Sequence, residues 1–197
     1  MNIDSALAHL RSHEKRGFSQ SLDLNVTLKN IDLKRPENKF SKEVVLPHGR
    51  GKDVDVCIIS EASGLGKKEI DEFEKDKKKL KAFLKKYDFF LCEAPLMPIV
   101  GKSLGRYLAP KGKMPKLLPP GRDPATLIDE TKRSVRVRVR DSPSIQVTIG
   151  TEAMNDSQLR ENAEKVLEEI KKSLPGKVQI KNVYLKFTMT KPVKIKV

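Results

Sequence analysis

The sequence has few of the residues that form disulfides or hold metal ions. It contains two cysteines, three histidines and no tryptophan among 197 residues. Both cysteines lie inside apolar segments, Cys57 in CII and Cys92 in FFLC, and such positions are typical of buried thiols rather than of a disulfide or a metal site. His9 and His13 are one helical turn apart, but no cysteine or third histidine lies near them in the sequence. We therefore predict neither a metal site nor a cofactor.

The sequence also lacks long apolar runs. No segment approaches the roughly eighteen consecutive apolar residues that a membrane-spanning helix requires. The first residues, MNIDSALAHLRSHEKR, contain no apolar run of the length found in signal peptides. These absences predict a soluble, cytoplasmic protein without a membrane partner.

Acidic residues are too few to balance the basic ones. Forty lysines and arginines stand against 26 aspartates and glutamates, which gives a formal net charge of +14. A surface with this excess of positive charge attracts polyanions. Nucleic acid is therefore the leading class of partner.

Motifs of common enzyme classes are missing as well. The Gly-x-x-x-x-Gly-Lys motif of phosphate-binding P-loops does not occur in the sequence. His48 is the only histidine near a predicted loop, and no serine or cysteine motif of a nucleophilic triad accompanies it. We predict that the protein is not an enzyme.

Residues 101–122, GKSLGRYLAPKGKMPKLLPPGR, carry six basic residues and no acidic one. The glycines and prolines of this segment indicate a preorganised loop whose backbone can approach a partner closely. A phosphate backbone is the usual counter-charge for such a cluster, and a solvated surface loop is the alternative. The predicted phosphate contacts, as a secondary RNA-binding surface, are Lys102, Arg106, Lys111, Lys113 and Lys116.

The N-terminal part of the sequence predicts a helix followed by two strands. Residues 4–16 carry apolar side chains at helical spacing. Apolar and polar residues alternate over 22–28, as in a strand with one face on a core, and the change of phase at Ile31 indicates a bulge or the end of pairing. A second strand, 43–46, leads into a connector at 47–52, PHGRGK. The residues of this connector that we predict to act as a hinge are Pro47, His48, Gly49 and Gly51.

Beyond the connector the pattern becomes that of an α/β unit. The apolar runs at 54–59 and 89–92 are typical of strands covered on both faces. Helices are predicted at 67–87, 96–107 and 123–132, the last with Asp123 as its cap. The lysine run at 75–81 is interpreted as a solvated helix face. Strands alternating with helices in this way indicate a parallel sheet.

After residue 133 the strict alternation returns. Residues 134–140 and 145–149 predict an antiparallel hairpin with a row of arginines on one face, which is either solvated or in contact with an acidic partner. Asn155 and Gln158 resemble a capping box that opens a helix, and the Pro-Gly pair at 175–176 ends it. Three short strands are predicted at 178–180, 183–189 and 193–197.

Three motifs indicate a family. LPHGRGK at 46–52, LMPIVGKSLGRYLAPKGKMP at 96–115 and FTMTKP at 187–192 resemble, in this order and at these separations, ribosomal protein "L-one", the stalk protein of the large ribosomal subunit. The long basic motif is specific, whereas the short FTM match is not specific alone. The resemblance extends nearly from end to end. QSLDLNVTLKNIDLKRPENK at 20–39 and YDFFLCEAPLMP at 87–98 resemble the archaeal branch of the family more than the bacterial one. Thr190 and Ala109 stand where the motifs of the family usually have glycine.

The resemblance implies a fold class that combines α+β and α/β architecture in two domains. A discontinuous antiparallel-sheet α+β domain formed by both chain ends would comprise residues 1–52 and 133–197. A three-layer α/β (Rossmann-like) domain would be inserted at 53–132. The boundaries inferred from the residue pattern fit this nesting.

The resemblance also implies a structural RNA-binding protein of the large ribosomal subunit. In the family, the first domain binds a three-way junction of the large-subunit ribosomal RNA and forms the mobile stalk beside the exit site for transfer RNA. The implied partners are this ribosomal RNA, the exit-site transfer RNA and the protein's own messenger, whose translation many members repress. A non-ribosomal nucleic-acid-binding module is the alternative, and an enzyme acting on acidic substrates is a more distant one.

Carried onto this sequence, the RNA contacts of the family fall near the first strand, after the arginine row and near the C-terminus. The expected residues are Phe18, Gln20, Ser21, Arg140, Asp141, Thr188, Met189, Thr190 and Lys191. By their chemistry, Phe18 and Met189 offer apolar surface to a sugar or an unstacked base, whereas Ser21 and Thr188 can bind 2′-hydroxyls. Asp141 can accept a hydrogen bond from a base or a hydroxyl. Burial in the core is the alternative for Phe18 and Met189.

Overall fold

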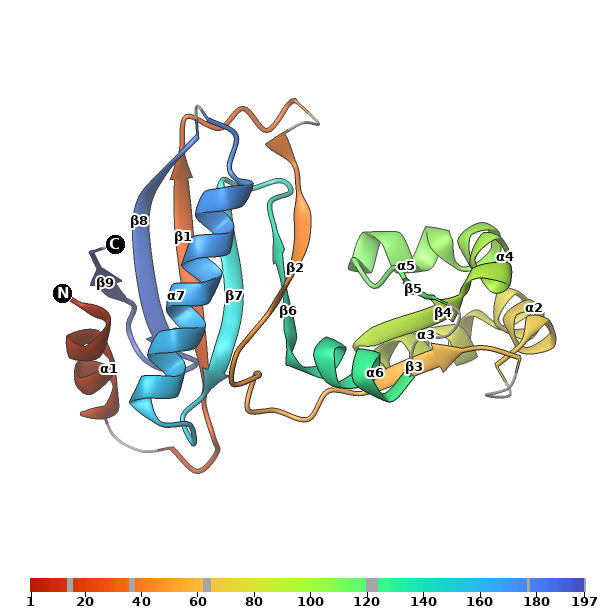
Figure 1. Cartoon of the computed structure of the whole chain (residues 1–197), viewed down its shortest axis with the longest axis horizontal. Coiled ribbons are helices and arrows are strands. Elements are labelled where there is room, and N and C mark those ends of the chain that lie inside the picture. Colours follow the sequence, from red (N-terminus) through yellow and green to blue (C-terminus); the bar gives the residue numbers. More distant parts are fainter. Residues whose placement is uncertain (14–15, 36–37, 62–64, 120–123, 177, 197) are drawn as a thin grey trace. The chain divides into compact units, whose positions relative to one another are not determined.

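The computed structural model describes the chain except for residues 14–15, 36–37, 62–64, 120–123, 177 and 197. The chain divides into two compact units. Unit 1 comprises Met1–Lys52 and Arg133–Val197, and unit 2 comprises Asp53–Lys132. Figure 1 shows the N- and C-terminal segments in the same unit. The mixture of helices with several sheets confirms the predicted fold class.

Unit 1 is built on a four-stranded antiparallel sheet with the strand order β7-β1-β8-β9. Its strands are β1 (Ser21–Lys29), β7 (Ser144–Thr151), β8 (Gln179–Phe187) and β9 (Val193–Ile195). Strand β1 lies between β7 and β8, and the strict alternation in its sequence gives it one buried face. Leu22, Leu24 and Val26 are fully buried, while the residues between them are half-buried on the other face.

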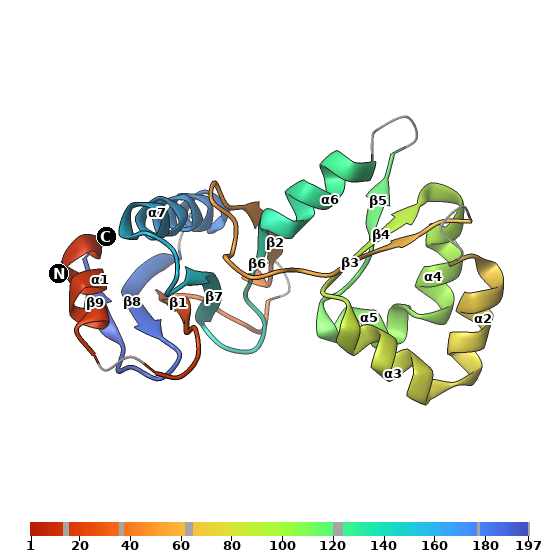
Figure 2. The same cartoon turned by 90° about the horizontal axis from the view of Figure 1, so that it is seen from below.

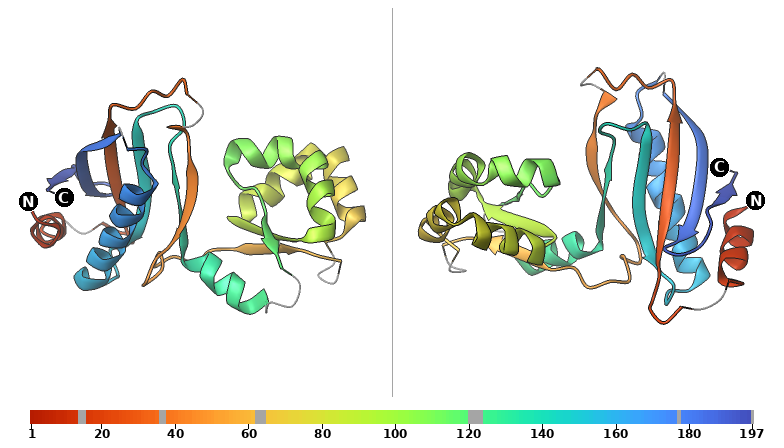
Figure 3. Two further views of the ribbon diagram at one scale, coloured as in Figure 1. Left: turned by 45° about the horizontal axis from the view of Figure 1, so that its top comes forward. Right: turned by 180° about the vertical axis from the view of Figure 1, so that it is seen from behind.

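Two helices cover one face of this sheet. They are α1 (Ile3–Arg11) and α7 (Asp156–Ser173). Figure 1 shows α7 in front of the sheet, and the view from behind in Figure 3 shows the strands with α7 on their far side. The N–H of Asn155 donates to Oε1 of Gln158 at 3.2 Å, so the predicted capping residues do open α7. Helix α1 ends at Arg11 rather than at residue 16, because the residues after Arg11 offer no apolar side chain to the sheet.

A separate two-stranded antiparallel sheet joins β2 (Ser41–Val45) to β6 (Ser134–Arg138). The predicted hairpin between 134–140 and 145–149 is therefore wrong, since β6 pairs with β2 while β7 pairs with β1. The N–H of Val139 donates to the carbonyl of Phe40 at 2.8 Å, which keeps β6 beside the segment that precedes β2. The valines of β6 still join the core of unit 1, because alternation fixes the buried face whichever strand is the partner.

The C-terminal region forms two strands rather than three. The segments predicted at 178–180 and 183–189 belong to the single strand β8, in which Thr27 pairs with Asn182 but Leu28 pairs with Ile180. This register shift leaves one extra residue in β8, and it explains why the apolar phase changes between Ile180 and Val183. Met189 lies outside the strand, in the turn that follows Phe187.

Unit 2 contains a three-stranded parallel sheet with the order β3-β4-β5. Its strands are β3 (Val56–Ile59), β4 (Phe89–Glu93) and β5 (Lys116–Leu118). Its helices are α2 (Lys67–Lys75), α3 (Lys77–Lys86), α4 (Met97–Ser103), α5 (Gly105–Lys111) and α6 (Pro124–Arg133), and a 3₁₀ turn spans Ala94–Leu96. Figure 2 shows α2 to α5 on one side of this sheet and α6 on the other, which gives three layers.

The helix predicted at 67–87 is two helices. The chain leaves the helical conformation at Asp76, whose carboxylate accepts hydrogen bonds from the N–H groups of Lys78 and Lys79 at 2.9 and 3.2 Å. Asp76 therefore caps α3, because its short acidic side chain accepts hydrogen bonds from N–H groups that have no partner within the helix.

The basic segment 101–122 is not a loop over most of its length. Helices α4 and α5 continue to Lys111, because Leu104 and Leu108 are buried at helical spacing, and β5 begins at Lys116. Among its described glycines only Gly112 has a positive φ, of 68°, where it ends α5. The predicted cap Asp123 and the last residues of the segment lie outside the described part of the chain.

Candidate nucleic-acid interface

The sheet of unit 1 has a polar face opposite α7. The half-buried residues of β1 alternate with its core residues, and the strand register aligns them with polar residues of the neighbouring strands. We call this surface the open face; it consists of Asp23, Asn25, Thr27, Gln146, Thr148, Asn182, Tyr184, Lys186 and Lys194. Among the described helices, none covers these strands in the view of Figure 3 from behind.

Amides and hydroxyls predominate on the open face. Asn25 lies opposite Gln146 on one side and Tyr184 on the other. The hydroxyl of Thr148 donates to Oδ1 of Asp23 at 2.7 Å. Amides, hydroxyls and an aromatic ring on a sheet are the groups with which proteins bind unstacked bases and 2′-hydroxyls of RNA. The alternation of these strands, which predicts the core face, also marks the polar face.

The turn after β8 continues the open face at one end. The N–H of Ser21 donates to the hydroxyl of Thr188 at 3.2 Å, and the N–H of Thr188 donates to the carbonyl of Ser21 at 3.1 Å. The N–H of Phe187 donates to the hydroxyl of Thr190 at 3.0 Å. Thr190 therefore closes this turn with its side chain, and it does so without a positive φ.

Gln20 supports this turn from beneath. Its side chain is 3% exposed, and its Oε1 accepts a hydrogen bond of 3.1 Å from the N–H of Met189. Its Nε2 lies 3.4 Å from Oε2 of Glu152. The structure thus places Gln20 where it orients the turn rather than where it meets a partner.

Phe18 and Met189 are exposed. Their exposed fractions are 52% and 61%, which excludes burial in the core for both side chains. Phe18 precedes β1 and Met189 follows β8, so both lie at the same end of these antiparallel strands. Lys191 is exposed in the same connection. Phe18 and Met189 therefore offer exposed apolar surface at this end of the open face.

Arg140 and Asp141 lie at the other end of the strands. Ser21 pairs with Thr151, whereas Thr27 pairs with Ser144, just after the segment that contains Arg140 and Asp141. Six residues of strand separate these ends by about 20 Å. The Asp141 carboxylate is exposed and lies 3.7 Å from Nζ of Lys39. The structure therefore divides the expected contacts into two groups, and the open face lies between them.

The arginines of the predicted row differ in their surroundings. Arg136 donates to Oε1 of Glu43 on the paired strand β2 at 3.0 Å, and both side chains are largely covered. Arg138 is exposed. At Arg136 the acidic partner is thus part of the chain itself.

The predicted hinge residues are held against α7. The side chain of Asn162, which is fully buried, donates from Nδ2 to the carbonyls of Gly49 and Ile149, both at 2.9 Å. Its Oδ1 accepts from the N–H of His48 at 3.2 Å, and Nε2 of His48 lies 2.6 Å from Oε2 of Glu161. Gly49 and Gly51 have φ values of +67° and +66°, which favour glycine. Residues 48 and 49 are therefore fixed to unit 1, and a hinge over Pro47–Gly51 stays a prediction.

The predicted secondary contacts in unit 2 differ in their surroundings. Lys102, Arg106 and Lys111 are exposed on α4 and α5. Nζ of Lys116 lies 5.9 Å from the centre of the Phe89 ring. Nζ of Lys113 donates to the carbonyls of Leu84 and Tyr87, so this lysine caps the end of α3.

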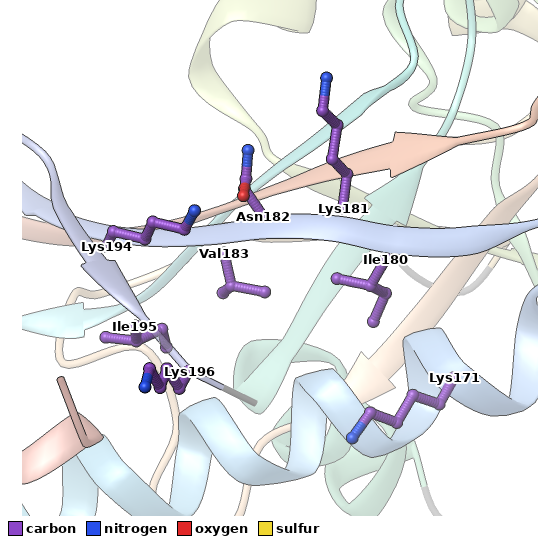
Figure 4. A pocket seen from close by; sticks show the side chains of 8 residues that line it. All are labelled: Lys171, Ile180, Lys181, Asn182, Val183, Lys194, Ile195 and Lys196. Atoms are coloured by element: carbon purple, nitrogen blue, oxygen red, sulfur yellow. The ribbon is translucent and has the colours of Figure 1, made fainter.

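A pocket of about 380 Å³ lies at the outer edge of the sheet of unit 1. Figure 4 shows that Ile180, Val183 and Ile195 point toward α7, whereas Lys181, Asn182 and Lys194 point to the other side of β8. The lysines of this pocket are divided between two sides of a strand. Lys181 and Lys194 extend the positive charge of the open face, whereas Lys171 lies on α7, so the lysines do not surround one ligand.

The described residues contain no group of three His, Cys, Asp or Glu side chains placed to hold a metal ion. Within the same residues no helix combines the length and the apolar character needed to cross a membrane. Cys57 and Cys92 are free and buried, as predicted, and burial raises the pKa of each thiol to about 11.

Comparison with known proteins connects this architecture with one family. Residues 10–191 match the family described as "Ribosomal protein L1p/L10e family". The chain is 45% identical to the large ribosomal subunit protein uL1 of Pyrococcus horikoshii, over 91% of this chain and 88% of the relative. It is 42% identical to the protein of the same name from Methanocaldococcus jannaschii, over 92% of this chain and 88% of the relative. The protein of that name from Methanothermococcus thermolithotrophicus is 39% identical over 98% of this chain and 97% of the relative.

Proposed function

Because the chain belongs to the ribosomal protein L1p/L10e family, we propose that it is a structural component of the large ribosomal subunit that binds ribosomal RNA through unit 1. The family predicted from the three motifs and the archaeal branch predicted from residues 20–39 and 87–98 are confirmed. The family consists of ribosomal structural proteins rather than enzymes, in agreement with the prediction made from the missing motifs.

One observation carries the RNA-binding proposal: an exposed methionine stands on a rigid turn at the end of the open face. Met189 is 61% exposed, while its backbone N–H is bonded to the buried Gln20. This bond fixes the backbone of the turn, so mainly the side chain of Met189 remains to be ordered when it contacts a sugar or a base. The hydroxyl of Thr188, the neighbouring residue, accepts from the N–H of Ser21 at 3.2 Å. Hydroxyls of these two residues can bind 2′-hydroxyls, which distinguish RNA from DNA.

The open face supplies the remaining contacts in this proposal. Its amides and Tyr184 would meet unstacked bases, and its lysines would meet phosphates. The groups at the two ends of β1, Ser21 with Met189 and Arg140 with Asp141, would then contact two parts of one folded RNA. A junction of helices offers such separated parts, so a three-way junction at the base of the stalk is the RNA that we propose.

Two further roles depend on where this RNA lies in the ribosome and on a similar RNA fold in the messenger. We propose that the protein forms the mobile stalk beside the exit site and there meets the departing transfer RNA. We also propose that the interface binds a similar fold in the protein's own messenger and represses its translation. Both roles use the same face of unit 1, so ribosomal RNA and messenger would compete for it.

Ultraviolet crosslinking of the protein to cellular RNA tests this function. Crosslinked peptides from residues 18–27 and 182–191 should map to a single region of the large-subunit ribosomal RNA, and a weaker set to the protein's own messenger. Competition between unlabelled ribosomal RNA and the messenger fragment for the purified protein separates the two roles. If ribosomal RNA is no more enriched than bulk messenger RNA, the chain is a different nucleic-acid-binding module and the proposal fails.

A further inference from the structure

Unit 2 carries its own basic surface in a groove between α3 and α5. The groove has a volume of about 590 Å³ and is lined by Lys77, Leu80, Lys81, Leu84, Lys85, Tyr107, Lys111 and Lys113. Its floor is apolar, since Leu80 and Leu84 are buried and Tyr107 is half-buried. Its rim consists of exposed lysines. We call this surface the lysine groove.

Three of the rim lysines form a row along α3. Lys77, Lys81 and Lys85 are four residues apart, so they lie on one side of the helix at intervals of about 6 Å. Like charges at this spacing destabilise a helix. Within the described part of the chain, neither these lysines nor Lys111 is paired with a carboxylate, although nearby Lys113 has one in Asp88. The row therefore has a cost to the fold that an anionic partner would remove.

The shape of the groove is fixed by Lys113. Its Nζ donates to the carbonyls of Leu84 and Tyr87 at 3.0 and 2.6 Å and lies 3.6 Å from Oδ1 of Asp88. These bonds tie the segment after α5 to the end of α3. The guanidinium of Arg106 lies 5.2 Å from the centre of the Tyr107 ring and donates to its hydroxyl at 3.0 Å, which orients that ring. The two walls are thus connected before any ligand binds.

We propose that the lysine groove is a second RNA-binding surface, on which phosphates contact Lys77, Lys81, Lys85 and Lys111 while a base or ribose packs on the apolar floor. The row of cations suits the phosphates of an extended strand, and leucines beside an aromatic ring suit the base that each phosphate carries. A purely acidic peptide would satisfy the lysines but would leave this floor exposed to water. The choice of RNA also rests on the proposed function, since a protein bound to ribosomal RNA places unit 2 among RNA strands.

The test uses the full chain and a labelled oligouridylate of about 16 nucleotides, which spans one single-strand binding site. The groove variant carries Lys77→Gln, Lys81→Gln and Lys85→Gln. The control variant carries Lys67→Gln, Lys79→Gln and Lys132→Gln, which removes the same charge from exposed positions of unit 2 outside the groove. Fluorescence anisotropy at several salt concentrations gives the affinity and its salt dependence.

For the groove variant we expect about a tenfold loss of affinity, and a slope of log affinity against log salt that is smaller by about 2, as for three lost phosphate contacts on a single strand. The affinity of the control variant for oligouridylate should fall by about twofold at most. Equal losses in both variants would mean that charge acts diffusely, and the inference would be wrong. If polyglutamate of equal charge displaces the protein's RNA as well as unlabelled oligouridylate does, the partner is an acidic protein instead.

Two further variants keep the test decisive. Lys81→Gln alone should weaken oligouridylate binding about threefold, and it replaces the triple variant if circular dichroism shows that the triple variant is unfolded. Met189→Asp should lose the distinction between ribosomal RNA and scrambled RNA while it keeps oligouridylate binding. If Met189→Asp loses this distinction but the groove variant binds oligouridylate with unchanged affinity, the inference about the lysine groove is wrong and the function proposed for unit 1 is not affected. The opposite result, a weakened groove variant with Met189→Asp unaffected, would overturn the function proposed for unit 1.

Discussion

The N–H of Met189 donates a hydrogen bond of 3.1 Å to Oε1 of Gln20, a residue 169 positions earlier in the chain. Gln20 is buried and Met189 is the most exposed of the large apolar side chains described. The bond therefore connects the interior of unit 1 to the exposed turn at the end of the open face. It requires both chain ends in one unit, and it fixes the backbone of the turn at Met189.

The first prediction concerns Met189. Met189→Asp places a negative charge where we expect RNA, so binding to the ribosomal RNA junction should weaken by at least about 2 kcal/mol, roughly 30-fold. The exposed position predicts an unchanged melting temperature. Met189→Leu, which keeps an apolar side chain, serves as the control and should bind nearly as well as the unaltered protein. Unfolding of the Asp variant would show that Met189 belongs to the core.

The second prediction concerns Asn162. Asn162→Leu removes the partner of the His48 N–H and of the Gly49 and Ile149 carbonyls. Buried polar groups without partners cost free energy, so urea denaturation should show a loss of about 2 to 4 kcal/mol. Glu161→Gln on the same helix, at an exposed contact to His48, should change stability by less than about 0.5 kcal/mol. Similar effects of the two substitutions would contradict the role assigned to Asn162.

The third prediction concerns salt. If unit 1 makes several phosphate contacts, log affinity for ribosomal RNA should fall linearly with log salt, with a slope of roughly −0.7 to −0.9 per contact. Filter binding at a series of potassium chloride concentrations measures this slope. A slope near zero would mean that the basic surface of the protein does not meet the phosphate backbone.

The fourth prediction concerns the insertion of unit 2. The two ends of unit 2 leave neighbouring strands, since Val45 pairs with Ser134 and the N–H of Leu46 donates to the carbonyl of Arg133 at 3.0 Å. Replacement of Asp53–Lys132 by a short Gly-Ser linker should therefore leave a folded unit 1, because closing a short flexible loop costs little entropy. Circular dichroism checks folding.

RNA binding by the excised protein is the decisive measurement. It should still distinguish ribosomal RNA from scrambled RNA, since the open face and Met189 remain, while its affinity and its salt dependence decrease with the loss of the lysine groove. A folded protein that no longer makes this distinction would place sequence recognition in unit 2.

The fifth prediction concerns the cysteines. Burial raises the pKa of Cys57 and Cys92 to about 11, so at pH 8 both are almost wholly protonated and lack the nucleophilic thiolate. Alkylation by iodoacetamide at pH 8 should be slow in the native protein and fast in guanidinium chloride, as mass spectrometry can follow. Rapid labelling of the native protein would contradict the burial of these thiols.

The sequence by itself determined the elements whose signal is local. Alternation in 22–28 revealed β1 and its buried face, the residues Asn155 and Gln158 marked the start of α7, and the motifs identified the family. Each of these features depends on residues close together in the chain, where backbone geometry relates spacing to structure directly.

Only the tertiary structure decided which elements meet. Alternation in 134–140 fixed a buried face but could not choose β2 over β7 as the partner, because the same apolar side chains suit either pairing. Spacing likewise could not distinguish Lys113, whose ammonium group caps α3, from Lys81, which remains exposed on the groove. The distance of about 20 Å between the two groups of expected RNA contacts follows from strand register. Register depends on hydrogen bonds between residues far apart in sequence, so the open face that joins these groups appears only when the chain has folded.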